Sequence, residues 1–324
     1  MRQPGRRPKG PILTFDGCMR QPNICAACEG DVHEAFAVGS FLYVRCNRCG
    51  TLQLAETPQQ DDLRQLYQQD DTWTSSKDTS LDDPQQEQRE TRRRLTALRD
   101  LGIGVGRVFE LGPGQGYLAR ALAASGSEVT VFELHEETTN RLRDHGINAL
   151  RDLSSLQGQY DTIILWGVIE HLEDPFGVLS VLQKRLTLNG SFVVLTEDSS
   201  CWFARMAGRR WSWLLPPEHV VLFSRRGLEA CLGRLGCRLV AYRSWPTVIR
   251  AIVSSALGQE RALKWRHGFR TARRLVRASQ GGARSRIVGV AKRILDTRLR
   301  LICEHKVYRF SMEPPRPPGI HSPS

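Results

Sequence analysis

The stretch Val108-Phe109-Glu110-Leu111-Gly112-Pro113-Gly114-Gln115-Gly116-Tyr117 decides the fold. Its first residues form an apolar strand, which runs into a glycine-rich turn and then into a helix from Tyr117. Such a turn places a ligand over the N-terminus of the helix, and glycines let the backbone approach that ligand. The spacing is Gly-x-Gly-x-Gly, and Tyr117 stands where a dinucleotide fingerprint has its third glycine. The turn therefore favours a nucleotide-like ligand other than a dinucleotide.

Acidic residues at the ends of the next two strands strengthen this interpretation. Glu133 ends a strand predicted at 129–134, where a carboxylate can accept hydrogen bonds from both hydroxyls of a ribose. Asp152 closes a short strand at 147–151 and could accept from an adenine amino group. A nucleotide-binding fold that takes another ligand, or that has lost binding, remains the alternative.

Strands and helices alternate along the centre of the chain. Further strands are expected at 161–166, 191–195 and 237–242, with helices at 117–125, 136–144, 175–188 and 224–235. This alternation predicts an α/β fold, a Rossmann-like doubly wound parallel sheet with helices on both faces. A stretch at 301–312 is expected to add the final edge strand.

The order of these motifs resembles class I S-adenosylmethionine-dependent methyltransferases over roughly residues 84 to 245. Beyond the glycine turn and Glu133, the strand Tyr160-Asp161-Thr162-Ile163-Ile164-Leu165 precedes Ile169-Glu170-His171-Leu172-Glu173-Asp174-Pro175. The pattern is most similar to the branch that contains ubiquinone-type O-methyltransferases and sugar methyltransferases. The resemblance implies a cofactor site in which the methionine part of S-adenosylmethionine lies among Glu110, Gly112, Gly114 and Gly116, the ribose on Glu133 and the adenine on Asp152.

Two cysteine pairs stand before this domain. Cys25-Ala26-Ala27-Cys28 and Cys46-Asn47-Arg48-Cys49 have the spacing of two knuckles that supply four thiolates to one structural zinc ion. Such a closed site folds a module and leaves no position for a substrate. The surrounding sequence resembles the N-terminal zinc ribbon of bacterial zinc-ribbon methyltransferases. A pair of reduced or redox-active knuckles is the alternative.

Two histidines are candidate general bases at the carboxyl edge of the sheet. His171 follows the strand at 161–166, and His219 lies in Pro216-Pro217-Glu218-His219. Histidine titrates near neutrality and can take a proton from a methyl acceptor. In sugar C-methyltransferases a Tyr-x-Glu-His stretch contributes to the active site. Glu218 and His219 match its second half, and Pro216 stands in place of the tyrosine. Structural hydrogen bonding is the alternative for either histidine.

The charge of the chain is concentrated in one segment. The net charge is +12, and residues 261–310 hold 15 Lys and Arg against Asp296 and Glu304 alone. Amphipathic basic helices expected there could cover the core, lie on an anionic membrane or contact nucleic acid. No apolar run is long enough for a membrane span, and no signal sequence is apparent, so we expect a cytoplasmic protein, peripheral to a membrane if the segment binds one.

The domains expected from these patterns are a flexible basic arm (1–20), a zinc ribbon (21–56), a helical connector (57–100), a methyltransferase core (101–247), a basic helical insertion (248–300), the edge strand (301–312) and a disordered tail (313–324).

The function expected from the sequence is methyl transfer to oxygen or carbon of a small or lipid-linked acceptor, such as a sugar or a glycan or natural-product intermediate. The alternatives are an RNA methyltransferase and a non-catalytic zinc-ribbon binding protein that carries an inactive methyltransferase-like domain.

Overall fold

The computed structural model describes residues 23–56, 84–104, 106–245 and 305–312. The expected basic arm, most of the connector, the basic insertion and the tail lie outside these residues. The strands are β1 (Val32–Val38), β2 (Phe41–Cys46), β3 (Leu52–Leu54), β4 (Arg107–Leu111), β5 (Glu128–Phe132), β6 (Asn148–Leu150), β7 (Tyr160–Trp166), β8 (Leu186–Glu197), β9 (Val221–Leu222), β10 (Cys237–Trp245) and β11 (His305–Met312). The helices are α3 (Pro84–Asp100), α4 (Tyr117–Ala124), α5 (Glu136–Asp144), α6 (Pro175–Gln183), α7 (Trp202–Ala207) and α8 (Arg225–Gly233), with 3₁₀ turns η1 (Leu153–Ser155), η2 (Ile169–His171) and η3 (Gly208–Arg210).

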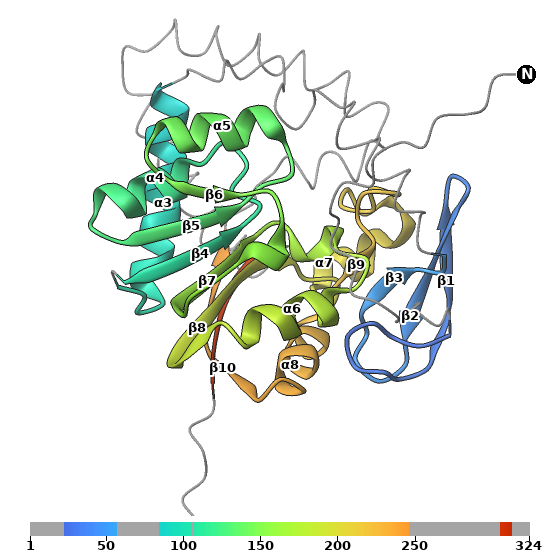
Figure 1. The fold of residues 1–324 in the computed structure, drawn as a ribbon. Helices are drawn as coiled ribbons and strands as arrows, with labels where there is room; N and C mark the ends of the chain where they lie inside the picture. The colour runs from blue at the N-terminus through green and yellow to red at the C-terminus, as the bar shows by residue number, and fades with distance from the viewer. Residues whose placement is uncertain (1–22, 57–83, 105, 246–304, 313–324) are drawn as a thin grey trace, which may run out of the picture.

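The larger sheet has seven strands in the order β10-β11-β8-β7-β4-β5-β6 (Figure 1). Strands β6, β5, β4, β7 and β8 run parallel, and β11 is antiparallel to both β8 and β10. Helices α3, α4 and α5 cover one face and α6 and α8 the other (Figure 1). The doubly wound α/β fold expected from the alternation of strands and helices is confirmed.

Alternation along the central strands places successive side chains on opposite faces. Phe109 and Leu111 pack with α6 and α8, whereas Val108 packs with α3 and α4. Glu110 has the same orientation as Val108, so its carboxylate lies on the face that α3 covers. Burial of each large apolar side chain stabilises the sheet by about 1.5–3 kcal/mol.

Strand β11 corrects one expectation. We expected residues 301–312 to form an edge strand, but Tyr308 pairs with Val194 of β8 on one side and with Tyr242 of β10 on the other. Val307 and Tyr308 stand among charged residues, which suggested a partly solvated edge strand. These charges have partners inside the fold, because Lys306 pairs with the Asp198 carboxylate and Arg309 donates to the carbonyl of Leu101. The edge strand is β10.

The smaller sheet has the order β1-β2-β3-β9, so its last strand comes from the chain beyond β8. Leu52 pairs with Leu222 and Gln53 with Val221. The N-terminal module and the larger domain therefore share one sheet, drawn beside α7 in Figure 1. Among the helices that the structure describes, none is long and apolar enough to cross a membrane.

Candidate functional site

The glycine turn adopts a backbone that only glycine accommodates well. Gly112, Gly114 and Gly116 have φ angles of 64°, 56° and 71°. A Cβ at Gly116 would lie 2.3 Å from Cδ2 of Leu142, and one at Gly112 would lie 2.9 Å from Cγ2 of Val168. The turn is thus tight against both α5 and the residues after β7, and Gly114 is exposed just before the N-terminus of α4, where a ligand can approach the main chain.

Glu110 is a buried carboxylate without a partner. Its side chain is 0% exposed, and both carboxylate oxygens lack a hydrogen-bond partner within the described part of the chain. Burial raises the pKa of Glu110 to about 7, an effect that Arg94 opposes and Glu133 reinforces. A buried carboxylate without hydrogen bonds is costly, so this group is suited to a cationic or hydrogen-donating ligand.

Arg94 of α3 is a site residue that the sequence analysis missed. Its Nε is buried and lacks a hydrogen-bond partner among the described residues, and its guanidinium lies 5.4 Å from the centre of the Trp166 ring. Burial lowers the pKa of Arg94, which the neighbouring Glu110 opposes. Arg94 precedes Leu98 and Leu101 on the apolar stripe of α3, and this periodicity is the signal that could have revealed it.

The other two acidic residues lie along the same edge of the sheet. Glu133 follows β5, its Oε1 accepts from the His135 amide at 2.9 Å, and burial raises its pKa. Asp152 lies just beyond β6, where its Oδ1 accepts from the Ser154 amide at 2.9 Å. Hydrogen bonds from Ser154 lower the pKa of Asp152. Glu133 therefore lies near Glu110, whereas the carboxylate of Asp152 caps η1.

The two candidate histidines lie next to each other. Their ring centroids are 4.8 Å apart and their planes are inclined by 80°. Nδ1 of His171 is 3.0 Å from the carbonyl oxygen of Glu218, and Nδ1 of His219 is 2.8 Å from that of Trp213. A carbonyl oxygen only accepts, so each Nδ1 carries a hydrogen and the neutral ring has its lone pair on Nε2.

The immediate surroundings of the histidines are buried. His219 is 3% exposed, and burial lowers the pKa of His171 to about 3, with His219 as a further cause. Glu170 accepts a hydrogen bond from the Thr196 hydroxyl at 3.0 Å, and burial beside Glu197 raises the pKa of Glu170. Ligand atoms of Glu170, His171 and His219 lie within 4.8 Å of one another, a set that could hold a metal ion. Glu218 takes part in this arrangement through its carbonyl oxygen, which faces Nδ1 of His171.

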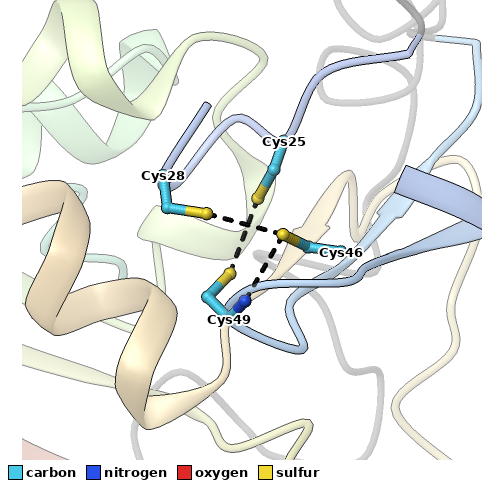
Figure 2. Close-up of side chains that lie close together, drawn as sticks. All are labelled: Cys25, Cys28, Cys46 and Cys49. Atoms are coloured by element: carbon cyan, nitrogen blue, oxygen red, sulfur yellow. Dashed lines mark hydrogen bonds between the residues drawn. The ribbon is translucent and has the colours of Figure 1, made fainter. Parts of the chain in front are cut away.

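The four cysteines meet as the sequence predicted (Figure 2). Sγ atoms are 3.7 Å apart for Cys25 and Cys49 and 3.4 Å apart for Cys28 and Cys46. A tetrahedral zinc site with Zn–S bonds of about 2.3 Å holds its sulfurs about 3.8 Å apart. All four side chains are at most 7% exposed. The donor set, its closure and its spacing fit a structural zinc ion.

Comparison with known proteins agrees with this geometry. Residues 85–242 match the family model described as "Methyltransferase domain". A ubiquinone biosynthesis O-methyltransferase of Erwinia tasmaniensis is 24% identical over 125 residues, which cover 35% of this chain and 51% of the relative. The protein of the same description from Bordetella avium is 32% identical over 125 residues, 35% of this chain and 52% of the relative. The chain thus spans about half the length of these curated relatives.

Solved structures that are similar also include methyltransferases. Magnesium protoporphyrin IX methyltransferase from Synechocystis PCC 6803 has a TM-score of 0.44 and 14% identity, covering 78% of this chain and 94% of that one. The 1,6-didemethyltoxoflavin-N1-methyltransferase of Burkholderia thailandensis has a TM-score of 0.46 and 12% identity, covering 86% and 99%. The family match, the strand order and the glycine turn together show that residues 85–242 form a class I S-adenosylmethionine-dependent methyltransferase domain.

Proposed function

We propose that the protein transfers a methyl group from S-adenosylmethionine to an oxygen or carbon of a small or lipid-linked acceptor. The observation that carries the proposal is the proximity of two groups of opposite charge, the Glu110 carboxylate and the Arg94 guanidinium, each with a buried polar atom that has no hydrogen-bond partner among the described residues. An amino-acid zwitterion has the complementary charges. The methionine end of the cofactor would donate from its ammonium to Glu110 and accept at its carboxylate from Arg94.

The remaining cofactor contacts follow from the same edge of the sheet. The open main chain of Gly112, Gly114 and Gly116 would take the methionine part, and Glu133 would accept from the ribose hydroxyls. Asp152 would face the adenine, and its carboxylate would accept a hydrogen bond from the base. The carboxylate would either keep its hydrogen bonds from Ser154 or give them up for this contact. When bound, the cofactor supplies an electrophilic methyl group. The chain binds and orients the reactants and excludes water around them.

A proton must leave the acceptor when a hydroxyl or an acidic carbon is methylated. Nε2 of His219 would accept that proton, because the bond from Nδ1 to the Trp213 carbonyl also stabilises the imidazolium. Burial lowers the pKa of His171 to about 3, so His171 would serve as a neutral hydrogen-bonding group beside the acceptor. Glu218 would contribute through its carbonyl, which fixes the ring of His171. Because the same atoms could hold a divalent cation, acceptor assays should run with and without a chelator.

The four-cysteine site would hold one structural zinc ion through Cys25, Cys28, Cys46 and Cys49. Its buried, mutually contacting thiols leave no open position for an acceptor, so the metal would stabilise the fold.

A lipid-linked acceptor also requires an approach to the membrane. The basic residues 261–300 lie outside the described residues, and the strands that flank them in the sequence are β10 and β11. Trp245 pairs with His305, which pairs with Glu197 at the carboxyl end of β8. The ends of β10 and β11 that flank this segment in the sequence therefore lie at the same edge of the sheet as the histidines, and we propose that the basic residues contact an anionic membrane.

The test is a screen of small hydroxylated and lipid-linked acceptors with radiolabelled S-adenosylmethionine, using wild-type protein and His219→Gln. Acceptor-dependent label transfer that the variant reduces by at least about 100-fold would support the assignment of a general base. Transfer only to RNA, or cofactor binding without transfer to any acceptor, would favour the RNA methyltransferase or the binding protein.

A further inference from the structure

The four-cysteine module (residues 23–56) is joined directly to the segment that carries His219. We call residues 211–222 the acceptor loop, because they contain Trp213 and His219 and end in β9. The amide of Leu54 donates to the carbonyl of Val220 at 3.0 Å, and Gln53 pairs with Val221. Strand β9 thus belongs to the sheet of the module, and the loop before it ends on that sheet.

Tyr43 of the module contacts the histidine itself through the main chain. Its side chain is 0% exposed, and its hydroxyl donates to the carbonyl oxygen of His219 at 3.1 Å. Burial raises the pKa of Tyr43, which keeps the hydroxyl neutral and able to donate. The amide of His219 donates to Leu215 at 2.9 Å. The module therefore fixes one side of His219, and the loop itself fixes the other.

The cysteine end of the module also holds the chain immediately after the acceptor loop. Ser224 Oγ donates to the carbonyl of Cys49 at 2.6 Å, and the Ser224 amide lies 3.3 Å from Oγ1 of Thr51. A Cβ at Gly227 would lie 2.0 Å from that same oxygen, so the start of α8 fits closely against the loop of the second cysteine pair. The acceptor loop is consequently anchored to the module at His219 and just after β9.

We propose that the four-cysteine module is a positioning element of the acceptor site and that Tyr43 is the positioning residue for His219. The hydrogen bonds described above join the module to residues 219–224, whereas Glu110, the glycine turn and Glu133 lie on β4, β5 and the loops that follow them. Disturbing the module therefore changes the acceptor side of the site and leaves cofactor binding intact. The importance of this coupling for catalysis rests on the proposed function, but the coupling itself is measurable without an acceptor.

The experiment compares the full-length wild type with Tyr43→Phe and a matched control, Tyr160→Phe. Tyr160 is also buried, and its hydroxyl donates to a loop carbonyl, that of Gln157, at 2.9 Å. The readouts are hydrogen exchange of residues 211–222, ¹⁵N chemical shifts of the His219 ring, bound zinc and calorimetric affinity for S-adenosylhomocysteine. Loss of one buried hydrogen bond corresponds to about a fivefold change in an opening equilibrium.

The expected result is about fivefold faster exchange in the acceptor loop of Tyr43→Phe and a second tautomer of His219, with zinc content and affinity unchanged. Tyr160→Phe should show wild-type exchange in that loop and one His219 tautomer. Equal protection and one tautomer in Tyr43→Phe would overturn the proposal.

A second arm removes the metal by chelation, so that the conclusion does not depend on one substitution. Faster exchange across the acceptor loop with retained cofactor affinity supports the module as a positioning element. Unchanged loop protection after zinc loss overturns it. If the loop responds but His219→Gln keeps full methyl transfer, then the role of His219 as a base is wrong and the coupling stands.

Discussion

The rings of His171 and His219 meet edge to face with their centroids 4.8 Å apart, although they belong to different segments of the chain. His171 follows β7, whereas His219 precedes β9. The Nδ1 of each ring faces a main-chain carbonyl of the acceptor loop, which fixes the tautomer of both. A hydrogen bond joins the two segments next to the histidines, because the amide of Val220 donates to the carbonyl oxygen of Glu170 at 2.8 Å.

His171 should remain neutral far into the acidic range. Burial lowers its pKa to about 3 from an ordinary value of 6.5, so ¹⁵N NMR of the ring should show no protonation at pH 5. Because the pKa of His171 is lower in the folded than in the unfolded protein, its contribution to the free energy of unfolding is fully present above about pH 6.5. This contribution is lost as the pH drops toward 3. His171→Gln should therefore lose part of the acid sensitivity of the unfolding free energy. A ring that titrates near 6.5 would contradict the buried placement.

Glu110 should make cofactor binding dependent on pH. With a pKa raised to about 7 by burial, the carboxyl is mostly protonated at pH 6 and mostly ionised at pH 8. The ammonium of the cofactor favours the ionised form, so the affinity for S-adenosylhomocysteine should rise about tenfold over this interval. Glu110→Gln should bind more weakly at pH 8, with a nearly flat profile. Because the ligand's own titration is common to both proteins, equal slopes would contradict the assignment.

Gly116 should tolerate alanine much less well than a glycine of similar backbone conformation. Gly116 and Gly146 have φ angles of 71° and 75°, but a Cβ at Gly116 meets Leu142 at 2.3 Å, and one at Gly146 meets nothing within 4 Å. Both alanine variants carry the strain of a left-handed residue, about 1–2 kcal/mol. Gly116→Ala should lose about 1–3 kcal/mol more in urea denaturation, because the buried Leu142 side chain must shift. Equal losses would show that the turn does not need this close contact.

The cysteine cluster should bind one zinc ion per chain and depend on each thiolate. Metal analysis of Cys49→Ser should show loss of zinc, and its melting temperature should fall well below that of the wild type. Cys201→Ser is the control, since Cys201 lies outside the cluster and is only half-buried. Full zinc occupancy in Cys49→Ser, or none in the wild type, would refute a four-thiolate site.

The sequence sufficed for the succession of strands and helices in the central part of the chain because apolar periodicity and the glycine turn are local signals. Strands such as β7, with Ile163, Ile164 and Leu165 fully buried, are apolar without interruption. The expectation that β11 is an edge strand was wrong because Lys306 and Arg309 find partners in groups that are distant in sequence, the Asp198 carboxylate and the carbonyl of Leu101. Such pairings depend on tertiary contacts that no local pattern encodes.

For the candidate site as well, the sequence revealed the residues in short motifs and did not reveal those that tertiary contacts bring together. The cysteine spacing predicted the cluster, since both knuckles are short motifs. The sequence nominated His171 and His219 separately, but only the fold shows that they touch. Arg94 was missed because it ends a run of three arginines, Arg92, Arg93 and Arg94, and no functional motif marks the one that continues the helical spacing of Leu98 and Leu101. The pairing of β9 with β3 was missed because two residues are too few for a strand signal.

The most direct test of the central claim is calorimetric titration of the zinc-loaded protein with S-adenosylmethionine and S-adenosylhomocysteine, alongside Glu133→Ala and Arg94→Gln. The account predicts one site of micromolar affinity in the wild type and a loss of at least about tenfold in each variant, because each removes a charged partner of the ligand. Absence of binding to the folded wild type, or equal affinity in all three proteins, would contradict it.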